Sequence, residues 1–82
     1  MPGTVRLRGR VEDGLVPAEK IFTVENADGV TEEIPVSTGS ISDDRLIASE
    51  IAQDEGNVLV ELPRESTSGR WRIWVKASEV GT

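Results

Sequence analysis

The chain has 82 residues, with 15 acidic and nine basic side chains and neither His nor Cys, a length that permits one domain. The missing Cys excludes disulfide frameworks and Cys-based zinc sites, and the missing His removes the usual general base near neutral pH. No apolar run approaches the length of about 18 residues that a membrane-spanning helix needs. We therefore expect a single domain over residues 1–82 with no membrane span, no metal and no cofactor.

The charge is distributed unevenly along the chain. The formal net charge is −6, which disfavours non-specific binding to nucleic acid. Residues 1–10 hold three Arg and no acid, residues 11–69 hold 14 acids and three bases, and residues 70–82 hold three bases and one acid. Both ends are therefore basic around an acidic centre. The first residues form no apolar signal segment, so we expect a cytoplasmic protein.

Residues 4–11 alternate between apolar and basic side chains. One face holds Val5, Leu7, Gly9 and Val11, and the other holds Arg6, Arg8 and Arg10. Alternation of this kind predicts a half-buried strand. Gly9 falls on the apolar face, where a missing side chain is typical of a bulge or a sharp bend.

Residues 20–25 and 30–36 predict a hairpin, because both are rich in β-branched and apolar types. The turn between them is Asn26-Ala27-Asp28-Gly29, in which Gly29 can adopt a positive φ. Pro35 cannot donate a ladder hydrogen bond, so the second strand is expected at a sheet edge. The register stays open, because each simple pairing leaves a Glu opposite an apolar residue.

Residues 43–55 allow two interpretations, of which the first is a short helix. Ser42 stands before Asp43-Asp44 and Gly56 follows the segment. A Ser N-cap, acids in the first turn and a Gly at the C-cap are typical of helix ends.

The second interpretation is a strand over residues 46–53. It turns through residues 54–57 into the next strand and directs three side chains inward: Ile47, Ser49 and Ile51. We favour the strand, because short Gly-containing turns between apolar runs are typical of hairpins.

Residues 58–62 and 70–76 predict two strands joined by a polar loop. One antiparallel register satisfies both faces: Leu62 meets Trp71, Val60 meets Ile73 and Val58 meets Val75 on the inner face, while Glu61 meets Arg72 and Leu59 meets Trp74 outside. A slip of one residue would bury arginines. Residues 77–80 then predict a single helical turn.

These segments predict an all-β fold: a small five- to six-stranded antiparallel barrel or bent sheet, with the short helix near 43–55 as the alternative. The strand 58–62, the loop, the strand 71–76 and the turn 78–80 resemble the end of a Src-homology-3-like barrel. The resemblance is architectural and implies no particular function. The chain has no Tyr, so the recognition of proline-rich peptides is not carried over.

Trp74 is the leading candidate for a binding residue. If the inner face holds Trp71, Ile73 and Val75, Trp74 points outward among Arg70, Arg72 and Lys76. Exposed Trp side chains anchor protein partners and stack on bases. The structural alternative is that Leu59 and the neighbouring arginines cover it through cross-strand packing and cation–π contact.

The basic side chains suggest a second function. If the terminal strands lie side by side, six bases would form one patch around Trp74 that could bind nucleic acid: Arg6, Arg8, Arg10, Arg70, Arg72 and Lys76. The structural alternative is that four acids neutralise these bases within the protein: Glu12, Glu50, Glu61 and Glu65.

Catalysis is not expected. Neighbouring acids such as Glu32-Glu33 suit solvated turns and caps, and no His is present to activate a Ser or Thr. We therefore expect a non-enzymatic interaction or accessory module that binds a protein partner around Trp74, as a monomer or weak dimer. A nucleic-acid-binding module is the alternative.

Overall fold

The computed structural model describes residues 3–81, which form short strands and two 3₁₀ turns without an α-helix in that range. In chain order these elements are β1 (Thr4–Leu7), β2 (Arg10–Asp13), β3 (Glu19–Glu25), β4 (Thr31–Ser37), η1 (Thr38–Ser40), β5 (Ile41–Ser42), β6 (Arg45–Asp54), β7 (Asn57–Glu61), β8 (Arg72–Lys76), η2 (Ala77–Glu79) and β9 (Val80–Gly81). The all-β prediction is confirmed. The alternative helix near 43–55 is wrong, because β6 occupies that segment.

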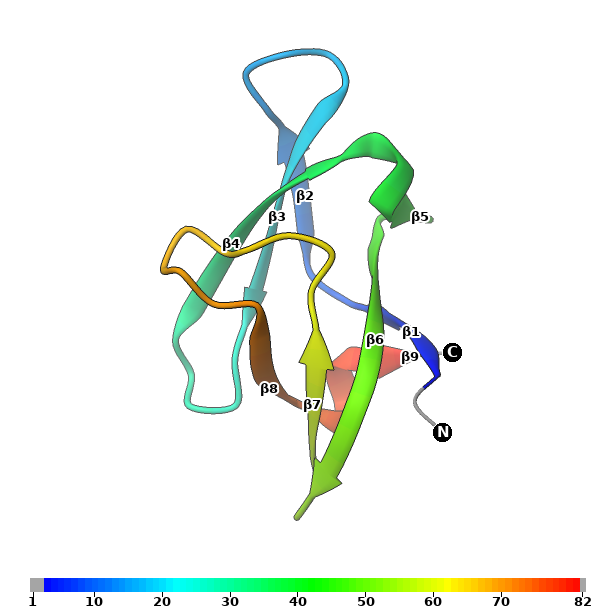
Figure 1. Cartoon of the computed structure of the whole chain (residues 1–82), viewed down its shortest axis with the longest axis vertical. Coiled ribbons are helices and arrows are strands. Elements are labelled where there is room, and N and C mark those ends of the chain that lie inside the picture. Colours follow the sequence, from blue (N-terminus) through cyan, green and yellow to red (C-terminus); the bar gives the residue numbers. More distant parts are fainter. Residues whose placement is uncertain (1–2, 82) are drawn as a thin grey trace.

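The strands of residues 3–81 form two antiparallel sheets and not a closed barrel. The larger sheet has the order β8-β7-β6-β1-β9, with β5 paired to β6, and the smaller has the order β2-β3-β4 (Figure 1). Side chains from both sheets join one buried apolar cluster, whose largest fully buried members are Phe22, Leu7, Ile34 and Leu46. The described strands outnumber the five or six expected, because the first one breaks in two and β5 and β9 have only two residues each.

Gly9 connects the two sheets at the bend between β1 and β2. A Cβ at this position would lie 2.4 Å from the carbonyl oxygen of Thr23 and 2.5 Å from Cζ of Phe22. Real Cβ atoms essentially never make non-bonded contacts below 3.0 Å, so Gly lets the chain pass this close to β3. The predicted bend at Gly9 is therefore confirmed, and its cause is the close approach to Phe22.

The structure of the β3–β4 hairpin explains why the sequence alone did not predict the pairing of its two strands. Phe22 pairs with Ile34, and Val24 pairs with Glu32, whose side chain is only 3% exposed. The pairing of a Glu with an apolar residue is thus real, and the carboxylate is on the core side. Gly29 has a φ of 81° in the connecting turn. Pro35 lies in β4 at the edge of its sheet, as predicted.

The predicted inner face of β6 is wrong. Leu46 and Ala48 are buried, whereas the expected residues Ile47, Ser49 and Ile51 are exposed or half-buried. The register with β1 decides this, because Leu46 lies opposite the buried Leu7 and Ala48 lies opposite the buried Val5. A register shift between Glu50 and Ala52 then leaves Ile51 as an inserted residue, which changes the face that later residues occupy.

The turns on either side of β6 are tight. Asp43 and Asp44 have φ values of 53° and 61° and form a hairpin turn instead of the first turn of a helix. The expected turn at residues 54–57 is confirmed, since Asp54 pairs with Asn57.

The register predicted for the last hairpin is confirmed. Val58 pairs with Val75, Leu59 with Trp74, Val60 with Ile73 and Glu61 with Arg72. The N–H of Leu62 donates to the carbonyl of Trp71 at 2.8 Å, which extends the ladder by one pair. The short helical turn is present as η2, after which β9 pairs with β1.

We expect Gly9→Ala to lower the free energy of unfolding by about 1–3 kcal/mol, because the methyl group must displace the backbone of β3 or the ring of Phe22. Urea denaturation measures the change. Gly39→Ala is the control, since its Cβ would meet nothing nearer than Ser37 Oγ at 3.9 Å. Equal stability of the two variants would contradict the close approach at Gly9.

Candidate functional site

Trp74 is 39% exposed on the outer face of the larger sheet, as the sequence predicts. It lies opposite Leu59 of β7, and Leu59 lies opposite Ala52 of β6. Leu59 is half-buried and Ala52 is exposed. These three residues form an apolar row across three strands, which we call the Trp74 row.

Polar side chains flank the Trp74 row on both sides. On one side the aligned residues are Arg72, Glu61 and Ser49, and on the other they are Lys76, Asn57 and Asp54. Arg72 donates from Nε and Nη2 to the same carboxylate oxygen of Glu61, at 3.0 Å and 2.9 Å. The row is thus an apolar strip with a charged border.

Trp71 does not occupy the inner face, which corrects the sequence expectation. Its side chain is 54% exposed and lines a depression of about 390 Å³ with residues that include Ile47, Ser49 and Pro63. The strand β8 begins only at Arg72, so the alternation of faces does not determine the direction of Trp71.

The N-terminal arginines lie on two different sheets. Arg6 is half-buried in β1 opposite Ile47, and Arg8 is exposed at the bend. Arg10 lies in β2, where its Nε is 3.0 Å from Oε1 of Glu12. The fold therefore separates these side chains along the bend at Gly9.

The C-terminal bases do not lie on a strand next to β1. In the larger sheet, β7 and β6 separate β8, which carries Arg72 and Lys76, from β1. The strand that does pair with β1 is β9, which contains no basic residue. The predicted patch of six bases needed the first strand to lie beside the strand of residues 70–76, and β1 and β8 are not neighbours in the described sheet.

Two of the four acids expected to neutralise the bases do so. Glu12 and Glu61 form the ion pairs with Arg10 and Arg72 described above. Glu50 instead accepts a hydrogen bond from Gln53 at 2.8 Å. Glu65 forms no ion pair within the described part of the chain.

A buried polar cluster, which the sequence reasoning missed, surrounds Glu32. Its Oε1 accepts from Ser68 Oγ at 2.7 Å, its Oε2 accepts from Asn26 Nδ2 at 3.2 Å, and Nε of Arg70 lies 3.8 Å from Oε2. Ser66 Oγ lies 3.0 Å from Ser68 Oγ. The one sequence signal was that each simple register of the hairpin left a Glu opposite an apolar residue.

This cluster positions the strand that carries Trp74. The Oδ1 of Asn26 accepts from the N–H groups of Asp28 and Val30 at 2.9 Å and 3.0 Å, and so fixes the turn between β3 and β4. From that turn, the N–H of Ala27 donates to the carbonyl of Trp74 at 2.8 Å. The smaller sheet therefore holds β8 along the edge that faces away from β7.

One pair outside the cluster alters a pKa. Lys20 Nζ lies 2.6 Å from Oδ1 of Asp13, at the end of the β2–β3 hairpin. The hydrogen bond from Lys20, with the attraction of its charge, lowers the pKa of Asp13 below its ordinary value. Both groups are on the surface, so the pair belongs to no enclosed site.

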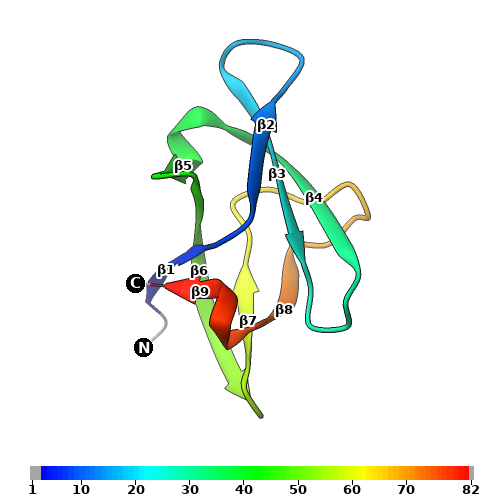
Figure 2. The same ribbon diagram turned by 180° about the vertical axis from the view of Figure 1, so that it is seen from behind.

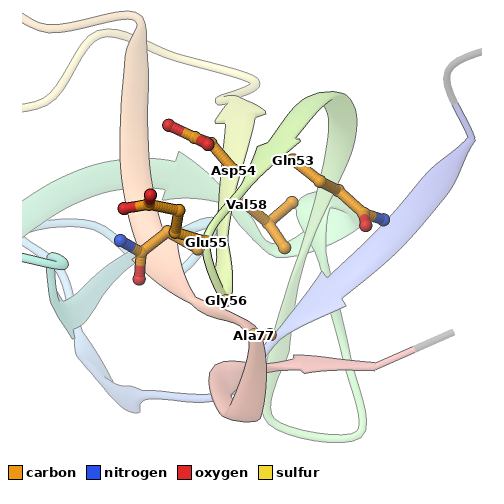
Figure 3. Close-up of a pocket in the computed structure, with 7 residues that line it drawn as sticks. Gln53, Asp54, Glu55, Gly56, Val58 and Ala77 are labelled. Atoms are coloured by element: carbon orange, nitrogen blue, oxygen red, sulfur yellow. The ribbon is translucent and has the colours of Figure 1, made fainter.

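A depression of about 390 Å³ lies at the tip of the β6–β7 hairpin, lined by residues 53–58 and Ala77. Gln53 lies on the side of the hairpin opposite to Asp54 and Glu55 (Figure 3). Within residues 3–81 no group of three or more Asp and Glu side chains could hold a metal ion. The hollow thus presents no convergent chemical groups.

Comparisons with known proteins give no further guidance: no family model, no curated protein and no solved structure matches the chain. In the part of the chain described, no helix has both the length and the apolar character needed to cross a membrane.

We expect Glu32→Ala to lower the free energy of unfolding by about 1–3 kcal/mol, because Asn26 and Ser68 lose a buried acceptor. Urea denaturation measures the effect. The matched control is Glu33→Ala at the adjacent exposed position, with an expected change within about 0.5 kcal/mol. If both variants lost the same free energy of unfolding, the hydrogen bonds from Asn26 and Ser68 to Glu32 would not be what stabilises the loop before β8.

We expect acrylamide to quench both tryptophans, and Trp71 at least as strongly as Trp74, because Trp71 is 54% exposed and Trp74 is 39% exposed. Trp74→Phe leaves Trp71 as the only emitter, and Trp71→Phe leaves Trp74. Stern–Volmer plots of the two variants give the comparison. Protection of either emitter would show that its side chain is covered.

Proposed function

We propose that this domain is a non-enzymatic interaction module that binds a protein partner through the Trp74 row. The single observation that carries the proposal is the alignment of Trp74, Leu59 and Ala52 on the outer face of three paired strands. A Trp held on a rigid strand can be buried by a partner with little loss of conformational freedom, and Trp is enriched among binding hot spots.

The border of the row supports a protein partner. Protein interfaces combine an apolar centre with a polar, solvent-accessible rim. Here the centre is the Trp74 row, and the rim contains the paired Arg72 and Glu61 on one side and Lys76 on the other. The charges beside the row have both signs, which favours a polar protein surface over a uniformly charged one.

A nucleic-acid partner has weaker support. Phosphate binding needs several free bases on one surface. Arg10, Arg70 and Arg72 each lie within 4.0 Å of a carboxylate oxygen, and β1 and β8 are not neighbours. The separated arginines and the net charge of −6 therefore favour the protein partner.

We propose that the C-terminal third of the domain resembles the end of a Src-homology-3-like barrel in its architecture. The order of β7, a loop, β8, the turn η2 and a last strand that returns to β1 supports this likeness. We propose the likeness for the architecture alone. Ligand recognition in this domain is assigned to the Trp74 row.

The test is affinity capture on the immobilised domain, followed by isothermal titration with each purified protein that it retains. We expect Trp74→Ser to weaken binding by about 30-fold or more, as for a hot-spot Trp worth about 2 kcal/mol. Leu15→Ser is the control, because Leu15 is the most exposed large apolar residue in the described chain and lies on the β2–β3 loop.

Two outcomes would oppose the proposal. Equal binding by the wild type and Trp74→Ser would remove the Trp74 row as the site. Tight binding of short RNA or single-stranded DNA, weakening steeply as salt rises, would replace the protein partner with a nucleic acid.

A further inference from the structure

The smaller sheet has one edge that other parts of the described chain leave uncovered. At the β4 edge, Pro35 has no N–H and the carbonyl of Glu33 accepts from the N–H of Thr67 at 2.8 Å. The edge of β8 in the larger sheet is held by the N–H of Ala27. The outer edge of β2 receives no such cover (Figure 2).

The alternation of hydrogen bonds shows which groups that edge presents. The N–H of Gly14 donates to the carbonyl of Glu19 at 2.9 Å, directly beyond the pair Asp13–Lys20. Bonded and non-bonded pairs alternate in an antiparallel ladder, so the backbone groups of Val11 and Asp13 point away from β3. Within residues 3–81, no backbone or side-chain hydrogen bond from outside the β2–β3 ladder reaches them.

We propose that β2 pairs with β2 of a second copy of this chain, giving a continuous sheet across a two-fold dimer. An antiparallel pairing centred on Val11 places Val11 opposite Val11 of the second copy, with two hydrogen bonds between them. In the same register Arg10 lies opposite Glu12 of the second copy, and Glu12 lies opposite Arg10. An edge of this kind is self-complementary, as a two-fold interface requires.

The charges select this register over its neighbour. Arg10 and Glu12 lie on the outer face, already 3.0 Å apart within one chain, and in the dimer each gains a partner of opposite charge across the strands. A pairing centred on Glu12 would instead bring two Glu side chains together and place Val11 opposite Asp13. Like charges directly opposite destabilise a sheet, so the pairing centred on Val11 is favoured.

Two further features suit this edge. Val11 is half-buried and packs against the core cluster, so the contact between the two Val11 side chains extends the apolar interior. The edge ends at Leu15, which is 97% exposed, and Val16, which is 56% exposed. The pairing places the loop that carries Leu15 and Val16 beside the bend of the second copy, so that the dimer can cover these exposed apolar side chains.

The test is sedimentation equilibrium of the 82-residue chain with charge-reversal variants. We expect the wild type to show a concentration-dependent equilibrium between monomer and dimer. Arg10→Glu and Glu12→Arg should each weaken dimerisation by about tenfold or more, because every dimer contains two copies of the mismatch. Arg64→Glu, in the loop after β7, is the control for an equal change of charge and should dimerise as the wild type does.

A mixing experiment makes the test specific to this register. Equimolar Arg10→Glu and Glu12→Arg chains should form a heterodimer, because each Glu of one chain then faces an Arg of the other. The double variant with both changes should recover the wild-type dissociation constant. A monomeric wild type at the highest soluble concentration would overturn the proposal, and so would a mixture in which the two variants stay apart.

Amide exchange gives an independent readout. The N–H groups of Val11 and Asp13 should exchange more slowly as the protein concentration rises, while that of Glu33 on the opposite edge should not change. Exchange of Val11 and Asp13 that is independent of concentration would also overturn the proposal. Because Trp74 lies on the other sheet, loss of dimerisation can be told apart from loss of partner binding.

Discussion

A carboxylate buried on the core side of β4 joins the turn between β3 and β4 to the loop before β8, where the two sheets meet. Glu32 accepts hydrogen bonds from Asn26 and Ser68 and lies near Arg70. A buried charge is tolerated only when its neighbours satisfy it, so the turn between β3 and β4 and the loop before β8 must both close around it. The junction of the sheets therefore depends on a polar cluster at the margin of an otherwise apolar core.

The sequence predicted the register of a strand pair correctly where the side chains on both faces agreed on one pairing. In the β7–β8 hairpin, Val60 with Ile73 and Glu61 with Arg72 agree on one register, and the structure contains it. The same alternation placed Trp74 outside. It failed at Trp71, whose carbonyl still accepts from Leu62 but which lies one residue before β8, where the chain enters the strand and the alternation of faces does not determine the direction of the side chain.

Other features depended on contacts between distant parts of the chain. The inner face of β6 follows from its pairing with β1 and from the inserted Ile51. Because both faces of that strand carry apolar residues, the sequence alone did not show which face is buried. Ser68 lies 36 residues from Glu32, so no local pattern could reveal their contact. The misfit of Glu in the hairpin register was the only trace of the cluster, and it could be interpreted only once the loop was in place.

The backbone and the side chain of Trp74 contribute to different parts of the structure. Its carbonyl accepts the hydrogen bond from Ala27 that joins the sheets, a bond that any amino acid at position 74 could form. Its indole contributes to the outer surface. Mutation at this position can therefore change the outer surface while the junction persists, so that the binding site we propose could change its specificity without rebuilding the scaffold.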